Sequence, residues 1–262
     1  MNIKDNLLIT VLGSGASTGV PIVSCECAVC TSNNPFNKRT RTSLFIEDKK
    51  FKQNILIDAS TDLRFQLLSQ NITTVDHVLF THTHADHCHG IDDLRPLFFF
   101  RKKPIHIWAT GDHLKDLKQR FAYLFYKTSY SGTVPHIIVH ELKETEFYLG
   151  KRRVFYYPLP HGHMNSNAFL FDNFLYATDF HRFPDEYIVK MRDKVDIMIA
   201  SGLRMQEHPT HFSIPQTLDL FNKLQIQSGF MTHLSHSVDY ESTNKSLPNK
   251  FKLAYDGLSF KL

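Results

Sequence analysis

Hydrophobic residues recur along the chain in short runs that are rich in Val, Ile, Leu and Phe and are bounded by Gly, Asp, Asn or Pro. Runs of this length and composition are typical of β-strands. Eleven runs predict strands: residues 7–12, 55–57, 78–80, 105–108, 137–139, 154–157, 168–171, 174–177, 197–199, 230–232 and 251–255. A turn at Asp172-Asn173 would join two of them as a hairpin.

Apolar residues at helical spacing are less common and predict three helices. One covers residues 63–69 and a second runs from 112 to about 126. The third begins at Ser213, where Ser-Ile-Pro-Gln forms a capping box with proline in the first turn. Its apolar face would pack on a sheet and consists of Ile214, Leu218, Phe221 and Leu224.

Many strands with a few interspersed helices indicate an α/β sandwich with sheets inside and helices outside. No internal repeat, low-complexity tract or Pro/Gly-rich linker divides the sequence, so we expect one domain over residues 1–262. No run approaches the roughly 18 apolar residues of a membrane span, and the N-terminus MNIKDNLLIT has no secretory signal pattern. We therefore expect a cytoplasmic protein with no membrane partner.

Composition adds a preference for anionic partners. Hydrophobic residues make up 42% and charged residues 21%, which is ordinary for a globular protein, and the net charge is +4. Basic residues cluster at 38–41, 101–103 and 151–153. Such clusters would suit an anionic substrate, although the last two are more simply explained as solvated surface.

The main chemical signal is the run His82-Thr83-His84-Ala85-Asp86-His87, which follows the apolar run 78–80 and so lies where a buried strand ends. Residues two apart in an extended segment point the same way, so His82 and His84 can face one ion. As the chain turns, Asp86 and His87 can face a second. Imidazole and carboxylate are ligands for zinc, manganese or iron. Three histidines and an aspartate in six residues are improbable in an ordinary polar loop.

This run resembles the His-x-His-x-Asp-His signature of the metallo-β-lactamase superfamily. The resemblance extends over nearly the whole sequence and includes Leu12-Gly13-Ser14-Gly15, Leu56-Ile57-Asp58 and Gly90-Ile91-Asp92-Asp93-Leu94. It implies an αββα sandwich, in which two central mixed β-sheets are flanked by helices. It also implies an active site with two divalent metal ions.

The same resemblance implies three further ligands, each just after an apolar run. They are His161 in Pro-Leu-Pro-His-Gly, Asp179 in Tyr-Ala-Thr-Asp, and His233 in Met-Thr-His. His163 is a rival to His161 and the choice stays open. The implied ligand set is His82, His84 and His161 for one ion, Asp86, His87 and His233 for the other, and Asp179 as the bridge. Asp58 would orient a ligand through a hydrogen bond.

Three of the four cysteines form Cys25-x-Cys27-x-x-Cys30, and this crowding favours a metal over disulfides. Three thiolates need a fourth ligand to close a tetrahedral zinc site, and His236 is the candidate. Such a site would be structural, tying an N-terminal loop to the loop after His233. Reduced cysteines without metal are the alternative. Cys88 is expected to be a buried structural thiol.

The cysteine cluster, together with Thr232-His233-Leu234-Ser235-His236, is similar to the phosphoribosyl cyclic phosphodiesterase branch of the superfamily, the PhnP family. Residues 37–43 are also similar to that branch. The segment between Asp93 and His161 departs from it, because residues 98–103 are all Phe, Arg or Lys. This segment could line the substrate pocket differently, so the substrate stays open.

The predicted activity is hydrolysis of a small phosphodiester, linear or cyclic. Two metal ions lower the pKa of a shared water and clamp the attacking and leaving oxygens of an in-line displacement. Asp86 would be catalytic through the metal centre, and His211 would donate a proton to the leaving group. For His211 the alternative is a solvent-facing loop histidine.

Three other functions remain open. A tRNA 3′-end endonuclease would share the ligands, but no long Gly-rich insertion for an RNA-binding arm is present, so nucleic acid is a less favoured partner. A lactone, thioester or β-lactam hydrolase would use the same metals on a carbonyl. A binding module with purely structural metals is disfavoured by the complete ligand set. Zinc and manganese are not distinguished, and a homodimer is implied by resemblance only.

Overall fold

The computed structural model describes residues 6–126 and 136–262, so the first five residues of the N-terminal stretch lie outside it. It contains two seven-stranded sheets. The first has the order β14-β1-β2-β3-β4-β5-β6. Its strands are β1 (Leu7–Gly13), β2 (Ser43–Asp48), β3 (Gln53–Ile57), β4 (His77–Leu79), β5 (Ile105–Ala109), β6 (Ile137–Glu141) and β14 (Ser259–Lys261).

The second sheet has the order β13-β12-β11-β10-β9-β8-β7. Its strands are β7 (Glu146–Leu149), β8 (Arg152–His161), β9 (Met164–Phe171), β10 (Phe174–Ala177), β11 (Ile197–Ser201), β12 (Ser228–Thr232) and β13 (Phe251–Leu253). Both sheets are mixed, because β3 to β6 and β10 to β13 run parallel and the remaining pairs are antiparallel.

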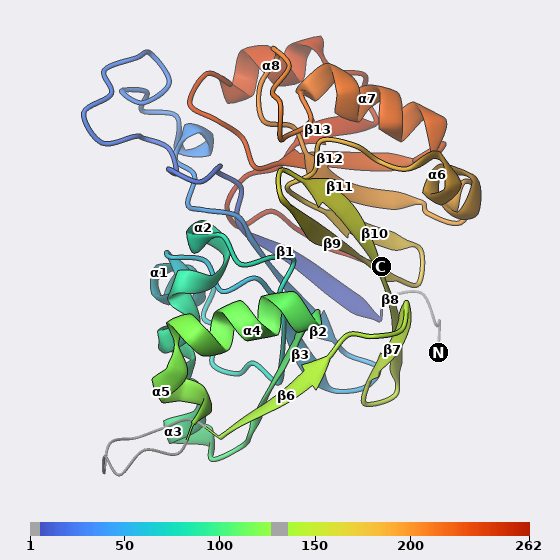
Figure 1. The fold of residues 1–262 in the computed structure, drawn as a ribbon. Helices are drawn as coiled ribbons and strands as arrows, with labels where there is room; N and C mark the ends of the chain where they lie inside the picture. The colour runs from blue at the N-terminus through green and yellow to red at the C-terminus, as the bar shows by residue number, and fades with distance from the viewer. Residues whose placement is uncertain (1–5, 127–135) are drawn as a thin grey trace.

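Helices cover the outer face of each sheet (Figure 1). On the first sheet lie α1 (Leu63–Ser69), α3 (Leu94–Arg101), α4 (Gly111–Arg120) and α5 (Ala122–Phe125); on the second lie α6 (Asp185–Met191), α7 (Ile214–Lys223) and α8 (Tyr240–Ser246). The short α2 (Ala85–Cys88) and the 3₁₀ turns η1 (Pro35–Asn37) and η2 (His89–Asp93) lie in loops. The predicted αββα sandwich is therefore confirmed.

Three hydrophobic clusters hold these layers together. One fills the space between the two sheets and includes Ile9 and Phe171. A second joins the first sheet to its helices, for example through Leu114, and the third joins the second sheet to its helices, for example through Phe221. Because both faces of each sheet are covered, a central strand such as β10 is buried along its whole length.

Most predicted elements are present, including α1 with its predicted bounds and the hairpin that joins β9 to β10. The capping box of α7 is formed, since Ser213 Oγ accepts from Gln216 N and Gln216 Oε1 accepts from Ser213 N. The hydrophobic runs do not predict β2, β7 or β14. Both β7 and β14 are edge strands with exposed alternate residues, and β2 ends in Asp48, which is buried against Arg152.

Two helical expectations need correction. The helix predicted from 112 to about 126 is interrupted at Phe121, so α4 and α5 are separate. The segment rich in Phe, Lys and Arg forms α3 on the outside of the first sheet, where Phe100 is 79% exposed. It is therefore not a lining of the site described below. No helix in the described part of the chain is long and apolar enough to cross a membrane.

Candidate active site

The predicted metal-binding run begins in the loop after β4 and continues into α2, which contains Asp86 and His87. His82, Asp86 and His87 are buried, and His84 is exposed. The ligand atoms of His82 and His84 converge with those of His161 to within 4.8 Å of one another, whereas Asp86 and His87 converge in the same way with His233. The two halves of the run therefore contribute to different groups, and His82 and His87 also share a third group with Asp179.

His161 completes the first group. It is the last residue of β8, and its Nε2 lies 3.2 Å from His84 Nδ1. Its Nδ1 lies 3.0 Å from the carbonyl of Thr210, to which it can only donate, so Nε2 carries the free lone pair. His163 is exposed in the turn that follows and belongs to none of the converging groups among the described residues. The geometry thus favours His161 over His163.

The second group depends on a buried hydrogen bond. His87 Nδ1 donates to Asp58 Oδ2 over 2.7 Å, which directs His87 Nε2 toward Asp86 Oδ2 at 3.3 Å. His233 Nε2 lies 3.7 Å from the same Asp86 oxygen. Asp58 is itself held in place, because it accepts from the backbone and hydroxyl of Thr81. It lies where an orienting carboxylate is expected.

Asp179 lies between the two groups. Its Oδ2 is 3.0 Å from His87 Nε2, and its Oδ1 is 3.1 Å from His233 Nε2. It also converges with His82 in one group and with His161 in another. A carboxylate placed in this way can offer one oxygen to each of two ions. The backbone N–H of Asp179 donates to Ser201 Oγ at 2.7 Å, which holds the residue at the end of β10.

Three site residues adopt a backbone conformation that non-glycine residues rarely occupy. Asp58, Asp179 and His233 have φ values of 64°, 56° and 57°. Asp58 and His233 directly follow β3 and β12, and Asp179 is the second residue after β10. Each such residue costs on the order of 1 kcal/mol and persists only where the surrounding structure enforces it. At all three positions the surrounding structure therefore holds a strained backbone next to the converging ligand atoms.

Burial and charge give His82, His161 and Asp179 the protonation states that metal binding needs. At His87, in contrast, Asp179 and Asp86 outweigh burial and raise its pKa well above the usual range, so His87 must release a proton when an ion binds. Burial holds the pKa of His82 well below its usual range and lowers that of His161 to about 4, so both imidazoles are neutral. Burial opposes ionisation of Asp179, but His233 and His87 outweigh it and hold its pKa well below the ordinary value. Neutral imidazole and ionised carboxylate are the forms that bind cations.

The buried nitrogens at the centre fit divalent ions. His82 Nε2, His87 Nε2 and His233 Nε2 are buried without an aligned hydrogen-bond partner in the described chain. Buried polar atoms are nearly always paired in folded proteins, so three neighbouring unpaired nitrogens are unusual. The donors are imidazole and carboxylate, which suit zinc or manganese.

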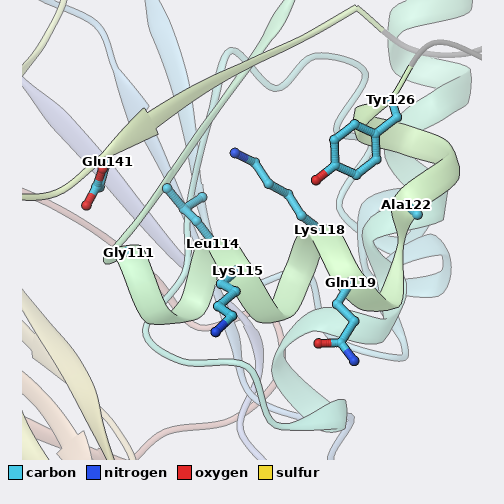
Figure 2. Close-up of a pocket in the computed structure, with 8 residues that line it drawn as sticks. All are labelled: Gly111, Leu114, Lys115, Lys118, Gln119, Ala122, Tyr126 and Glu141. Carbon is cyan, nitrogen blue, oxygen red and sulfur yellow. The ribbon is translucent and has the colours of Figure 1, made fainter.

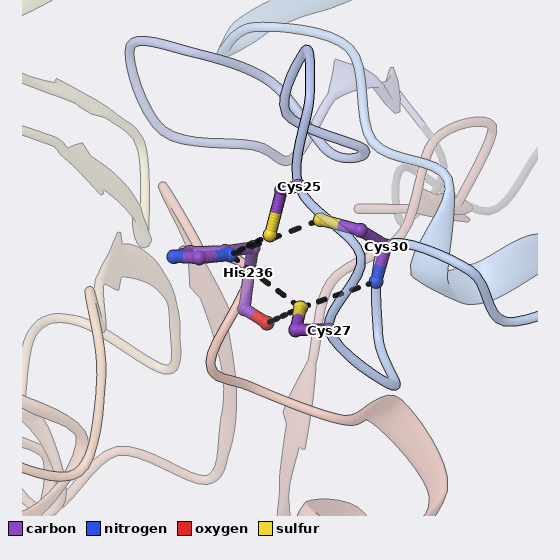
Figure 3. Close-up of side chains that lie close together, drawn as sticks. All are labelled: Cys25, Cys27, Cys30 and His236. Carbon is purple, nitrogen blue, oxygen red and sulfur yellow. Dashed lines mark hydrogen bonds between the residues drawn. The ribbon is translucent and has the colours of Figure 1, made fainter.

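The second predicted cluster also forms (Figure 3). His236 Nδ1 lies 3.2, 3.5 and 3.8 Å from the sulfurs of Cys25, Cys27 and Cys30. Ligand bonds of 2.0–2.3 Å in a tetrahedron give ligand separations of about 3.6 Å, so the spacing fits zinc. The Cys30 backbone N–H donates to Cys27 Sγ and lowers the pKa of that thiol to about 6. Cys88 is buried elsewhere and donates to the carbonyl of Thr83.

Sequence patterns do not reveal several supporting residues. Thr81, Ser201 and Thr210 hold a ligand or its partner through hydrogen bonds, two from Thr81 to Asp58 and one each from the others. Threonine and serine are common at strand ends and in loops, so these positions carried no distinguishing signal. Only the adjacency of Thr81 to His82 could have suggested a role for it.

Comparisons with known proteins agree with this geometry. The family model of the beta-lactamase superfamily domain matches residues 53–234. The chain is similar to the solved structure of a new diphosphatase from the PhnP family, with 33% identity, coverage of 98% of this chain and 97% of that one, and a TM-score of 0.90. Zn²⁺-bound PqqB from Methylobacterium extorquens, at 17% identity, 97% and 100% coverage and a TM-score of 0.78, shares the fold.

A curated relative is much longer than this chain. An octanoyltransferase of Porphyromonas gingivalis is 35% identical over 251 residues, which is 95% of this chain and 50% of that protein. The chain spans about half the length of the curated relatives it matches, or less. This similarity therefore does not show that the half of the octanoyltransferase shared with this chain carries the named activity.

Proposed function

The chain belongs to the beta-lactamase superfamily and, within it, to the PhnP family, and on this premise we propose that it is a dinuclear metal-dependent phosphodiesterase acting on a small phosphodiester. The observation that carries the proposal is the position of Asp179, within 3.1 Å of both His87 Nε2 and His233 Nε2 and grouped with His161 on its other side. A two-ion site is suited to displacement at phosphorus.

The ligand assignment follows the converging groups. His82, His84 and His161 would hold one divalent ion, and Asp86, His87 and His233 would hold the other, with Asp179 between them. Two bound ions, zinc or manganese, would activate a water and neutralise the charge that develops on the phosphoryl oxygens. A third ion, a structural zinc, would be held by Cys25, Cys27, Cys30 and His236.

The role proposed for His211 is proton donation to the leaving oxygen. Its Nδ1 lies 3.1 Å from Asp179 Oδ1, although the contact is not aligned as a hydrogen bond, and its side chain is 12% exposed. This contact orients the ring and leaves the other nitrogen for proton transfer. His211 also converges with His161 and Asp179, so the geometry allows His211 to be a ligand instead.

Metal content separates these two roles. In a His211→Ala variant that keeps both active-site ions, turnover should fall by roughly 10² to 10⁴ if His211 is the proton donor. Loss of one ion per chain, measured by elemental analysis, would make His211 a ligand. Full turnover with full metal content would remove both roles.

Hydrolysis of bis(p-nitrophenyl) phosphate by metal-loaded protein tests the function, with a ribose 1,2-cyclic phosphate in the same panel. We expect turnover that Asp179→Ala abolishes, and preference for the cyclic ester would match the resemblance to phosphoribosyl cyclic phosphodiesterases. If protein that is verified to contain both ions shows no turnover, acyl hydrolysis becomes the favoured function. Localisation, homodimerisation and RNA cleavage stay predictions.

Acyl hydrolysis is the second candidate because of the octanoyltransferase relative, although this chain matches only half of that protein. A thioester or lactone panel measured under the same metal loading would distinguish the two. The position of Asp179 between the two ligand groups favours the phosphodiester, because it would let two ions bind side by side and such a pair suits a phosphoryl group.

A further inference from the structure

Recognition of the leaving group depends on the side chains that adjoin the His and Asp cluster. A cavity of about 640 Å³ beside α4 and α5 does not qualify, because no described residue that lines it, such as Lys118 or Gln119, is a proposed metal ligand (Figure 2). Residues 204–211, which we call the 204–211 loop, do qualify. The loop lies between β11 and α7, and it carries His208 and His211.

Hydrogen bonds hold the 204–211 loop at its base and at the cluster. At the base, Leu203 N donates to Phe212 O at 2.9 Å. At the cluster, His161 Nδ1 donates to the Thr210 carbonyl at 3.0 Å. The loop is therefore anchored against a proposed metal ligand.

The ring of His208 lies at the edge of the cluster. Its centroid is 5.2 Å from that of His211, which in turn stacks on His233 with centroids 4.8 Å apart. Burial, followed by the neighbouring charges of His211, Arg204 and His233, lowers the pKa of His208. His208 is therefore close enough to contact a group that is bound beside His211.

Hydrogen bonding fixes which nitrogen of His208 carries the proton. Its Nδ1 accepts from the backbone N–H of Thr210 at 3.3 Å and lies 3.2 Å from Thr210 Oγ1. A backbone N–H can only donate, so Nδ1 is the acceptor and the neutral ring holds its proton on Nε2. In the part of the chain that the structure describes, Nε2 has no hydrogen-bond partner. His208 thus presents a free donor next to His211.

We propose that His208 is a substrate-binding residue that donates from Nε2 to an oxygen of the leaving group. The inference rests on the proposed function, in which His211 faces the leaving oxygen. A donor beside His211 would meet the atoms next to that oxygen. It would therefore favour a leaving group that has an oxygen acceptor close to the scissile ester, such as a sugar or another polyol, over an aryl group that has none there.

Two substitutions at His208 test this role. The shorter amide of His208→Asn can still accept from the Thr210 N–H but does not reach the position of Nε2, whereas His208→Gln places an amide N–H near it. The measured quantity is the ratio of kcat/KM for ribose 1,2-cyclic phosphate to kcat/KM for bis(p-nitrophenyl) phosphate. We expect His208→Asn to lower this ratio about tenfold, the size of one lost hydrogen bond, mainly through KM for the cyclic ester. His208→Gln should restore most of the ratio.

A structural role of His208 would give the opposite pattern. If His208 only holds Thr210, and through it His161, then kcat/KM for both esters should fall together and His208→Gln should be the more damaging change. That result, or an unchanged ratio in His208→Asn, would overturn the inference.

His163→Asn is the matched control, because it makes the same substitution at an exposed histidine in the turn that packs on Thr210 through Gly162. This variant should keep the wild-type ratio. An equal fall of the ratio in both Asn variants would show a general effect of losing a histidine near the cluster and would also overturn the inference.

Failure of the proposed function has a different signature, namely no hydrolysis of either ester by protein with verified ions. In that case calorimetry with ribose 1-phosphate and methyl phosphate decides the inference. Tighter binding of ribose 1-phosphate to the wild type, with this preference lost in His208→Asn, would support the role of His208. A preference that is absent from the wild type or kept in the variant would refute it.

Discussion

The two predicted metal clusters differ in how the chain holds them. The His and Asp cluster draws its ligands from the ends of several strands in both sheets, and all its proposed ligands but His84 are buried. The Cys25, Cys27, Cys30 and His236 cluster joins two loops, and three of its four residues are only half-buried. Packed sheets hold the residues of the first cluster in place, whereas loops hold those of the second, so we expect an ion to contribute more to the order of the second cluster.

A single segment nevertheless connects the two. His233 and His236 lie three residues apart after β12, and Leu234 between them is bonded to the N-terminal loop, since Leu234 N donates to Ser14 O and Leu234 O accepts from Ala16 N. We therefore expect the His and Asp cluster to control turnover and the cysteine cluster to control stability, with a modest effect of the second on the first.

The largest effect on turnover should come from Asp179→Asn. The amide keeps the shape of the side chain but offers only one acceptor oxygen and no charge, so it cannot serve two ions. We expect kcat/KM for bis(p-nitrophenyl) phosphate to fall at least about 10³-fold. Elemental analysis should still find the zinc of the cysteine cluster. Wild-type turnover would contradict the assignment, and loss of all ions would contradict the independence of the two clusters.

Asp58→Asn should weaken the same cluster without removing a ligand. The carboxylate accepts from His87 Nδ1 at 2.7 Å and sets which nitrogen faces the ions. Loss of such an orienting partner typically costs 10- to 100-fold in metal affinity, measured here by competition with a chelator. Asp62→Asn is the control, because Asp62 pairs with Arg41 outside the cluster. Equal affinities in the two variants would show that Asp58 has no orienting role.

The sequence reveals the local motif of each cluster, whereas His161, Asp179 and His233 were predicted only through the family resemblance. His82 to His87 and Cys25 to Cys30 each lie within six residues, so spacing alone identifies them. The choice between His161 and His163 needed the structure, because Pro158 and Pro160 interrupt the strand pattern after residue 157. In the fold, β8 continues to His161 beside β9 alone, and an edge position tolerates proline because one side needs no N–H donor.

Contacts between distant segments could not be predicted in this way. The bond from Asp179 N to Ser201 Oγ joins β10 to β11, and the carbonyl of Thr210 reaches His161 across 49 positions. No local pattern encodes such pairs, because they exist only once the sheet is assembled. The helices α6 and α8 were also missed because both are short and bury few side chains.

Cys30→Ser should affect stability more than catalysis. Loss of the zinc would release the N-terminal loop from His236. We expect this to lower the free energy of unfolding by about 3 kcal/mol, which corresponds to a fall in Tm of about 5–10 °C for a chain of this size. We expect turnover at 25 °C to fall less than about tenfold, with both active-site ions retained. Val23→Ser, at a 92% exposed position in the same loop, is the control for thermal unfolding. A Tm equal to that of the control would argue for reduced cysteines without metal.

A third cluster, made of histidines, differs from both metal-binding clusters because it has no anionic ligand. His77, His106 and His140 lie on β4, β5 and β6 around Trp108, and among the described residues they do not form a converging ligand group. His77 Nδ1 accepts from Trp108 Nε1, and the facing nitrogens of His106 and His140 are 2.8 Å apart. Burial, followed by the neighbouring charges of His106 and His140, lowers the pKa of His77 to about 4.

This cluster should make stability depend on pH without changing turnover at neutral pH. A folded pKa of about 4 against an ordinary 6.5 means that the unfolded chain binds the proton more readily. The stabilisation is therefore complete above about pH 6.5 and is lost as the pH falls toward 4, by on the order of 3 kcal/mol for His77. Burial also lowers the pKa of His106, and the neighbouring Asp76 carboxylate partly offsets this.

Urea unfolding of metal-free protein at several pH values between 7 and 4.5 measures this dependence. His77→Asn should flatten the loss of unfolding free energy over that range, whereas His163→Asn, at an exposed position, should keep the wild-type slope. The metal-binding histidines titrate in all three proteins, so the difference between slopes isolates His77. Parallel curves would mean that this cluster is pH-insensitive and that the acid sensitivity belongs to the metal-binding clusters.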